Sequence, residues 1–375
     1  MASIIYYFFI ASLATFFAYL TTHSKTAFKI DFGCKNDGFN TLYAFISFTV
    51  LFYLLAFTSS SGDLPNYLIY YSDSQDLKRF WDFYVGNHRI VWVLFNAIVS
   101  SFTDNYWIFS MFWAFTILVL IYIPLYRLRN EVSFHWSVFA ISFVYIYRGI
   151  SARRFILAFA IIVFGSYYYH RLKKLKFLIC IIVACSVHMS AACVAIYLVV
   201  ETLAQRRFFR VNRKLLFGIS IIGIAIVVLF GRGAISILSN TSYGVYKIET
   251  STYNLGLLCY YVLPYVLIYL FMNYYEKDNK IKGLWLSAII TSVCFSVMVC
   301  LFTATSRAAA FNCYLDIIYV PYIFKKAKEQ YRSNQIRIIQ MFYCVFVLWK
   351  FFEFFSGTAI TNGLIPYTNI FGLKL

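Results

Sequence analysis

Long apolar runs, separated by short polar clusters, make up most of this 375-residue chain. Many of these runs approach the length of about 20 residues that crosses a bilayer as an α-helix. They cover residues 4–20, 41–57, 106–124, 134–147, 155–169, 215–230, 255–272, 284–302, 308–324 and 336–355. Two further apolar stretches, 90–102 and 178–200, fit either a crossing or a segment that enters the membrane and returns. The pattern predicts an all-α, polytopic integral membrane protein with about 10 to 12 transmembrane helices.

The composition is typical of a chain that is embedded in a membrane throughout. Hydrophobic residues make up 62% of it and charged residues only 13%. A soluble domain with this balance would expose large apolar patches, so we expect residues 1–375 to form a single transmembrane domain. The first apolar run lacks a basic start and a small-residue cleavage site, which predicts a retained anchor instead of a signal peptide.

The net charge of +18 carries information about topology. A nucleic-acid-binding protein would gather its basic residues in one patch, whereas here they form short clusters between apolar runs, and we expect no nucleic-acid partner. The positive-inside rule assigns such clusters to the cytoplasm. All of them satisfy the rule if 90–102 stays at or re-enters from the outer face and 178–200 enters and returns. The clusters lie in the loops 21–40, 127–131, 170–176, 206–214, 276–282 and 325–337.

The alternative topology lets 178–200 cross the membrane once, because its 23 residues are long enough at about 1.5 Å per residue. That arrangement leaves the basic cluster at 206–214 outside. A broken helix at membrane depth requires a protein-enclosed cavity around it. In the preferred, re-entrant topology the outer face carries the loops 58–105, 148–154 and 231–254.

The nine cysteines do not indicate a metal centre. None belongs to a C-x-x-C pair with the spacing of a metal site. Several lie inside apolar runs, where cysteine acts as a small packing residue. We therefore expect neither a metal site nor a cofactor.

Four arginines stand out at the outer face of this topology. They are Arg148, Arg153, Arg154 and Arg307. A guanidinium group is always charged and its planar fork matches the geometry of phosphate, so arginines clustered at a membrane surface suit a diphosphate anchored in the outer leaflet. The alternative is that these side chains extend to lipid head groups and fix the helix ends.

Two residues are candidates for proton transfer. His188 lies in the middle of an apolar stretch, and imidazole takes up or releases a proton near neutral pH. The alternative for His188 is a structural hydrogen bond to a neighbouring helix. Asp63 follows a serine-rich helix end and a glycine at the membrane surface, which makes it the best candidate among the carboxylates of an outer loop that is also rich in tyrosine. Carboxylates and flat aromatic rings together are typical of sugar sites.

The order and spacing of several short motifs resemble a known family. The motifs are "GDLPNY" with Asp63 and Tyr67, "RFILA" from Arg154, the basic turn "HRLKKLKF", "ACSVHMSA" with His188, and "SRAAAFNCYLDIIYVP" with Arg307. They resemble the EpsG-like branch of the Wzy-type polysaccharide repeat-unit polymerases over most of the chain. The chain departs from the family at Phe155, where members typically carry glutamine, and around His88 and Arg89, where they often carry glutamate. The missing glutamate leaves the catalytic base open between Asp63 and His188.

The resemblance implies a glycan polymerase, a glycosyltransferase of the bacterial inner membrane with its site on the periplasmic side. It would transfer an undecaprenyl-diphosphate-linked glycan chain en bloc to a lipid-linked repeat unit. His188 or Asp63 would be the catalytic base, the four arginines would bind the diphosphate, and Tyr67 would contact the glycan. The implied partners are the lipid-linked oligosaccharide, membrane lipids, and flippase and chain-length regulator proteins.

Two other functions remain open. A ligase or another polyprenyl-dependent glycosyltransferase would share the outer-face site, but such enzymes usually have a paired acidic motif in the first outer loop, where "GDLP" has one acid. A polysaccharide transporter or flippase would carry its charges around a central cavity. The candidate charges here gather near one face, which disfavours transport.

Overall fold

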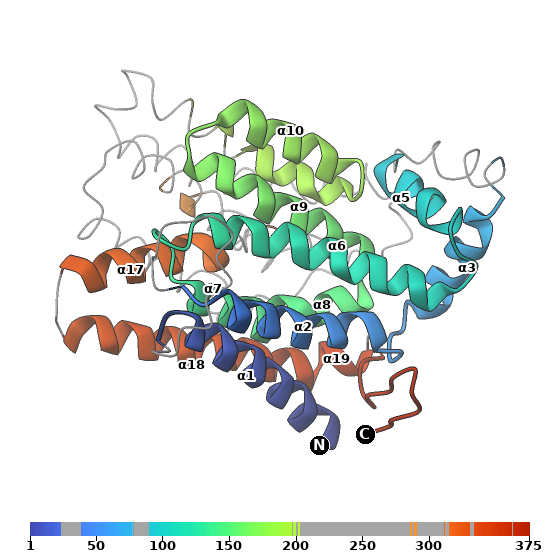
Figure 1. The fold of residues 1–375 in the computed structure, drawn as a ribbon, viewed down its shortest axis with the longest axis horizontal. Helices are drawn as coiled ribbons and strands as arrows, with labels where there is room; N and C mark the ends of the chain where they lie inside the picture. Colours follow the sequence, from blue (N-terminus) through green and yellow to red (C-terminus); the bar gives the residue numbers. More distant parts are fainter. Residues whose placement is uncertain are drawn as a thin grey trace, which may run out of the picture. The chain divides into compact units, whose positions relative to one another are not determined.

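The computed structural model describes residues 1–23, 39–76, 90–196, 315–330, 334–361 and 363–375, together with a few single residues between them. Within these ranges the chain is helical, and its extended pairing is limited to two isolated β-bridges (Figure 1). The chain divides into two units, Met1–Met189 with Asp316–Leu375 and Ser190–Leu315. Most of the second unit lies outside the described residues, so the account below concerns the first.

Three helices in the described part of the chain are long and apolar enough to cross a membrane. They are α1 (Ala2–His23), α6 (Tyr106–Arg127) and α18 (Asn334–Ser356). Two shorter apolar helices, α2 (Thr41–Phe57) and α5 (Ile90–Ser100), accompany them. These elements confirm the prediction of a helical membrane protein. The runs expected at 215–230, 255–272 and 284–302 lie outside the described residues, so the number of crossings stays a prediction.

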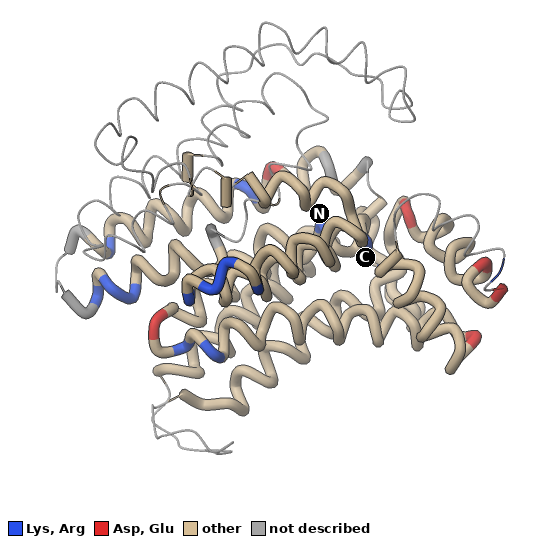
Figure 2. Tube along the Cα trace, turned by 90° about the horizontal axis from the view of Figure 1, so that it is seen from above, with Lys and Arg blue, Asp and Glu red and all other residues tan. Residues whose placement is uncertain are grey.

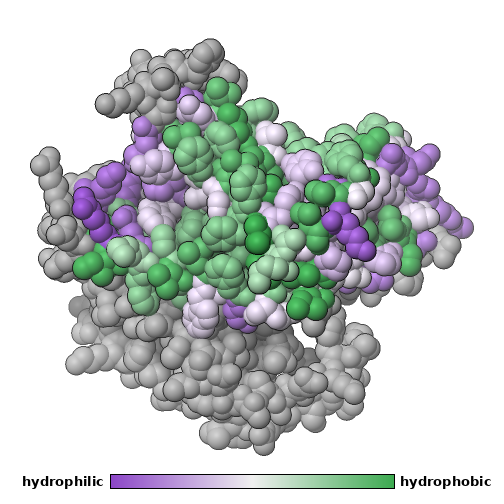
Figure 3. Space-filling view, turned by 90° about the horizontal axis from the view of Figure 1, so that it is seen from below, coloured by the Kyte–Doolittle hydropathy of each residue, from purple (hydrophilic) through white to green (hydrophobic). Residues whose placement is uncertain are grey.

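The surface of this unit has the hydropathy that a lipid environment requires. Figure 3 shows hydrophobic side chains over the middle of one face and more polar side chains toward its two ends. Large hydrophobic side chains are exposed along α1 and α18, among them Ile5, Phe9, Met341 and Val345. Because soluble proteins rarely expose large contiguous apolar surfaces, we assign this surface to the lipid.

The helices α1, α2 and α6 pack closely through small and polar residues. Ala14 on α1 is fully buried, and small residues of this kind let membrane helices approach one another. Oγ of Ser47 on α2 donates to the carbonyl of Ala14 at 2.8 Å and forms a hydrogen bond with Oη of Tyr122 on α6 at 3.0 Å. One serine therefore ties three helices together.

The run predicted at 134–147 is a helix in three parts. It consists of α7 (Phe134–Ala140), the π-helical turn η1 (Ile141–Tyr145) and α8 (Ile146–Ser151). The chain then turns at Ala152 into α9 (Arg153–His170). Gly149 makes this turn compact, because a Cβ at that position would lie 2.9 Å from Cγ1 of Ile156.

The stretch predicted at 178–200 is interrupted. A tight turn at Leu172, with a φ of 59°, leads into α10 (Lys174–Cys185), which packs back along α9. The helix α10 ends at Cys185, and a turn at 186–188 separates it from the 3₁₀-helix η2 (Met189–Val194). A break close to His188 is what the re-entrant topology requires. The residues that would return to the inner face lie largely outside the described ranges, so the return itself stays a prediction.

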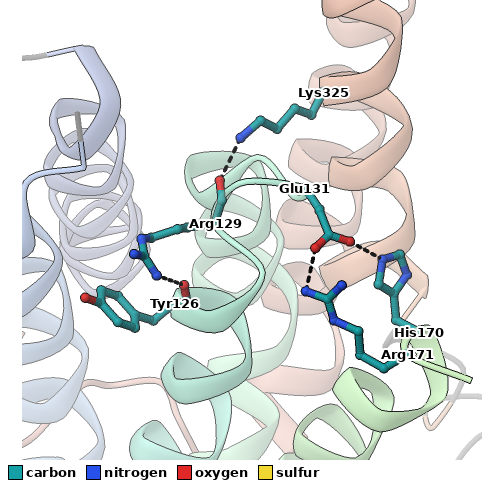
Figure 4. A network of polar contacts seen from close by, with 6 residues as sticks. All are labelled: Tyr126, Arg129, Glu131, His170, Arg171 and Lys325. Carbon is teal, nitrogen blue, oxygen red and sulfur yellow. Dashed lines mark hydrogen bonds and ion pairs between the residues drawn. The ribbon is translucent and has the colours of Figure 1, made fainter. Parts of the chain in front are cut away.

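The basic loops of the first unit meet at one end of the helices. Nζ of Lys325 donates to the carbonyl of Arg129 at 2.7 Å. Glu131 accepts from His170 at 3.1 Å and pairs with Arg171 at 2.5 Å (Figure 4). The loops 127–131 and 170–176 therefore lie beside the start of the 325–337 loop, as they must if all three face the same side of the membrane.

Most of the acidic residues drawn in Figure 2 lie at the other end, while Glu131 lies among the basic loops. Asp104 lies two residues before the start of α6, and Arg127 is the last residue of this helix. The short helix α3 (Leu64–Ser74) lies at the acidic end and contacts α5. The 11 residues of α5 span roughly 16 Å, about half of the hydrocarbon thickness, which fits a segment that does not cross the membrane by itself.

The remaining described elements close the first unit. They are η5 (Leu315–Tyr319), α17 (Val320–Gln330), α18, α19 (Thr358–Thr361) and an extended segment, 363–375. Asn369 of this segment forms a β-bridge with Thr58, at the end of α2. The segment therefore lies at the acidic end, next to the turn that precedes α3.

Candidate functional site

The site is built around the first turn of α9. This helix begins with Arg153 and Arg154, has no acidic residue in its first turn and has no side-chain cap. The amino end of a helix carries a partial positive charge, so two arginines there repel it. An anion at this position would relieve the repulsion and bind to the helix terminus.

Arg153 is buried in an aromatic cluster. Its side chain is 1% exposed, and Nη1 donates to Oγ of Ser110 on α6 at 2.9 Å. The guanidinium carbon lies 4.6 Å from the ring centre of Trp113, 5.2 Å from that of Tyr106 and 5.9 Å from that of Tyr67. Aromatic faces of this kind stabilise a cation. Among the described residues no carboxylate lies within ion-pair distance of Arg153.

Arg154 lies next to this cluster and is only half-buried. Its guanidinium carbon is 5.5 Å from the ring centre of Tyr70, and its positive charge acts on the hydroxyl of Tyr67. Burial raises the pKa of Tyr67, while the charge of Arg154 lowers it in part. Tyr67 is 5% exposed and packs against Trp92. In this arrangement it holds the start of α9 and presents little ring surface to a sugar.

Asp63 occupies the position before α3. Its carbonyl accepts from the N–H of Tyr67 at 3.1 Å, whereas its exposed side chain makes no capping hydrogen bond. The carboxylate lies close enough to the Tyr67 hydroxyl to raise the pKa of that hydroxyl further. Asp63 and the arginines of α9 therefore both lie near Tyr67.

His188 approaches the same turn of α9 from the end of α10. Its ring meets the ring of Phe155 edge-on, with the ring centres 5.8 Å apart, and its backbone N–H donates to Ala184 at 2.8 Å. Phe155 directly follows Arg154. Five of the seven predicted site residues thus lie around the first turn of α9: Asp63, Tyr67, Arg153, Arg154 and His188.

Of the other two predicted arginines, the structure describes only Arg148. Arg148 lies on α8, half-buried, and its carbonyl accepts from the N–H of Ala152 at the turn into α9. Arg307 lies outside the described residues. No group of three His, Cys, Asp or Glu side chains that could hold a metal ion occurs in the described part of the chain.

A comparison with known protein families gives independent evidence of the family to which the chain belongs. The model of the EpsG family matches residues 41–369, which include α3, α9 and His188. The chain belongs to the EpsG family. Neither the curated proteins nor the solved structures contain a match. The resemblance drawn from the short motifs is therefore confirmed, and family membership indicates a membrane protein of the polysaccharide-polymerase kind.

The aromatic residues around Arg153 form a part of the candidate site that motif comparison missed. Ser110 and Trp113 lie four and seven residues after Tyr106, which puts all three on one face of α6. A serine amid apolar residues, flanked on the same face by aromatic residues with polar atoms, was the available signal. Three buried donors in this region have no hydrogen-bond partner among the described residues: Nε of Arg153, Oη of Tyr106 and Nε1 of Trp92.

Proposed function

We propose that this EpsG-family protein is a repeat-unit polymerase. It transfers an undecaprenyl-diphosphate-linked glycan chain en bloc to a lipid-linked repeat unit, and undecaprenyl diphosphate is the leaving group. The observation that carries the proposal is the adjacent pair Arg153 and Arg154 at the amino end of α9, with no carboxylate partner for Arg153 among the described residues.

The charges at this helix end suit the leaving group. A sugar diphosphate gains negative charge as the glycosidic bond breaks, and fixed cations in a poorly hydrated site stabilise that charge without rearrangement. Arg154 is half-buried and can contact the phosphates with its fork. Arg153 adds a fixed positive charge from within the aromatic cluster, and its unpartnered Nε leaves one donor for a water molecule or a substrate oxygen.

The acceptor hydroxyl must lose a proton as it attacks the sugar. Two residues next to the arginines offer a base, the imidazole of His188 and the carboxylate of Asp63. His188 packs on Phe155, directly after Arg154, while Asp63 is exposed at the start of α3. We favour His188 slightly, because an imidazole group can both take up and release a proton during catalysis.

The setting of this reaction is the periplasmic face of the bacterial inner membrane. The common position of the basic loops 127–131 and 170–176 and the start of 325–337 supports their assignment to the cytoplasm. The site around α9 then faces the periplasm, together with the loops 58–105, 148–154 and 231–254. The proposal includes about 10 to 12 crossings, and flippase and chain-length regulator proteins as partners.

The two alternative functions are a ligase and a transporter. A ligase would act at the same outer face, and a transporter would carry its charges around a central cavity. Arg153, Arg154 and Asp63 lie at one end of the described helices, which favours a transferase. A site with one acid in "GDLP" favours the polymerase over transferases with a paired acidic motif.

A deletion strain tests the proposal directly. Surface glycan from a strain without the gene should contain single repeat units, and the wild-type gene should restore long chains where Arg154→Ala does not. Loss of all surface glycan in the deletion strain would instead indicate a transporter. Long chains that stay on the lipid carrier would indicate a ligase.

A further inference from the structure

The 363–375 segment lies directly against the turn that carries Asp63. The backbone N–H groups of Ser59 and Ser60 donate to the carbonyl of Thr368 at 2.9 and 3.2 Å. Oγ of Ser59 also donates to Oγ1 of Thr368 at 3.0 Å. The two stretches are therefore paired through both backbone and side-chain atoms, although they are some 300 residues apart in the sequence.

The segment is in turn fixed to the first two helices. Oη of Tyr7 on α1 donates to the carbonyl of Leu364 at 3.1 Å. Nδ2 of Asn369 donates to Oη of Tyr53 on α2 at 3.1 Å. Tyr7 and Asn369 are both buried. The segment is thus a rigid support between the helices and the turn.

The segment and the turn come into close contact at two glycines, Gly363 and Gly62. Gly363 has a φ of +67°, and a Cβ at this position would lie 2.8 Å from the backbone nitrogen of Gly62 and 3.2 Å from its Cα. These are backbone atoms, so they cannot rotate away as the end of a side chain could. Any residue larger than glycine at 363 must push the turn away, and Gly62 directly precedes Asp63.

The turn determines where α3 begins. The N–H of Leu64 donates to the carbonyl of Ser61 at 3.2 Å, and the N–H of Tyr67 donates to that of Asp63. The ring of Tyr67 in turn contacts the start of α9, because its centre lies 5.9 Å from the guanidinium carbon of Arg153. A shift at Gly62 therefore moves Asp63 relative to the first turn of α9.

We propose that Gly363 is a positioning residue, which holds the Asp63 carboxylate in place beside the arginines of α9 through its close contact with Gly62. This inference rests on the proposed function, because the position of Asp63 matters only if the site performs glycan transfer. The inference assigns a role at the site to the 363–375 segment, which none of the sequence motifs of the site includes.

The chain offers a matched pair of glycines for the test. Gly372 also has a positive φ, of +84°, but nothing lies within 4 Å of a Cβ built there. Gly363→Ala and Gly372→Ala thus introduce similar backbone strain, and only the first introduces a clash with the turn. In the complemented deletion strain, at equal protein in the membrane, Gly363→Ala should lower the yield of long chains about tenfold, as expected for a displaced catalytic group, while Gly372→Ala should not.

A double variant separates positioning from general damage. If Gly363 acts through Asp63, then Gly363→Ala and Asp63→Asn should lower the yield to the same level, and the combined variant should fall no lower. Losses that multiply in the combined variant would overturn the proposal, and so would equal yields from Gly363→Ala and Gly372→Ala. An Arg154→Ala variant with normal chains would overturn the proposed function itself. A defective Arg154→Ala alongside a normal Gly363→Ala would overturn only the role of Gly363.

A disulfide lock tests the same idea even if Gly363→Ala does not accumulate. The side chains of Ser59 and Thr368 touch, so the pair Ser59→Cys/Thr368→Cys should join on oxidation. Membranes with the joined pair, given lipid-linked repeat units extracted from the deletion strain, should polymerise at the wild-type rate, because the contact is permanent in the working protein. Activity that is lost on oxidation and restored by a reductant would mean that the segment must move, and Gly363 would not be a fixed support.

Discussion

Nη1 of Arg153 donates to Oγ of Ser110 at 2.9 Å, and Ser110 donates in turn to the carbonyl of Ala56 at 2.9 Å. A single hydroxyl therefore joins the start of α9 to α6 and to the end of α2. A buried guanidinium is costly unless hydrogen bonds and aromatic faces replace its hydration. The position of the first turn of α9, and of Arg154 with it, depends on this serine.

Ser110→Ala should destabilise the protein. The change leaves Nη1 of the buried Arg153 without its acceptor, which costs roughly 1–3 kcal/mol for a buried polar group. The control is Ser142→Ala, because Ser142 is equally buried but its Oγ makes no hydrogen bond among the described residues. Thermal unfolding of the purified proteins in detergent should show a lower midpoint for Ser110→Ala and no loss for Ser142→Ala. Equal midpoints would contradict the role of Ser110.

Arg154→Lys should fail almost as badly as Arg154→Ala. An ammonium keeps the charge but cannot offer a planar, two-pronged donor to a diphosphate. The chain length of the surface glycan is the measurement. Arg171→Lys is the control, since Arg171 pairs with Glu131 away from the site and should tolerate a lysine. Long chains from Arg154→Lys would reduce Arg154 to a simple positive charge.

Much of the helical arrangement could be predicted from the sequence. The apolar run at 4–20 corresponds to α1 at Ala2–His23, and the run at 155–169 corresponds to α9 at Arg153–His170. Such helices are predictable because a continuous apolar run specifies them through residues that are adjacent in the sequence. The break near His188 agrees with the re-entrant topology, which the positive-inside rule favoured over a single crossing.

The different environments of the two arginines could not be predicted from the sequence. Arg153 and Arg154 have similar apolar neighbours in the sequence, and adjacent residues on a helix point about 100° apart. Only one of them can face α6, and the packing of Trp113 and Tyr106 decides that it is Arg153. The support from the 363–375 segment was missed for a related reason: its contacts with Ser59 join residues about 300 positions apart, and no local pattern records them.

The contact between Glu131 and His170 should make stability depend on pH. The hydrogen bond from His170 and the charge of Arg171 hold the pKa of Glu131 below its ordinary value of 4.5. A carboxylate with a lowered pKa contributes stability that is fully present above its unfolded pKa and is lost as the pH falls through its folded pKa. Thermal unfolding between pH 7 and about pH 3 should therefore show a smaller loss for Glu131→Gln than for the wild type. An exposed acid outside the membrane-spanning helices, Asp104, supplies the control: Asp104→Asn should follow the wild-type curve.

The variants His188→Gln and Asp63→Asn should distinguish the two candidate bases. Each keeps a polar group of similar size and removes the group that can take up a proton. If His188 is the base, His188→Gln should lower turnover on the order of a hundredfold while the lipid-linked substrate still binds, as general-base catalysis alone is lost. Asp63→Asn should then be milder, at about tenfold, because loss of a charged group beside the site lowers turnover less than loss of the base.

The measurement is polymerisation of lipid-linked repeat units by purified, folded variants over a range of pH, where loss of the base also removes the rise in rate through the neutral region. Phe155→Leu is a useful third variant, since the ring of Phe155 packs edge-on against His188 at 5.8 Å, and it should lower turnover without changing the shape of that profile. A His188→Gln protein that polymerises at the wild-type rate would exclude His188 from the chemistry and leave Asp63 as the base.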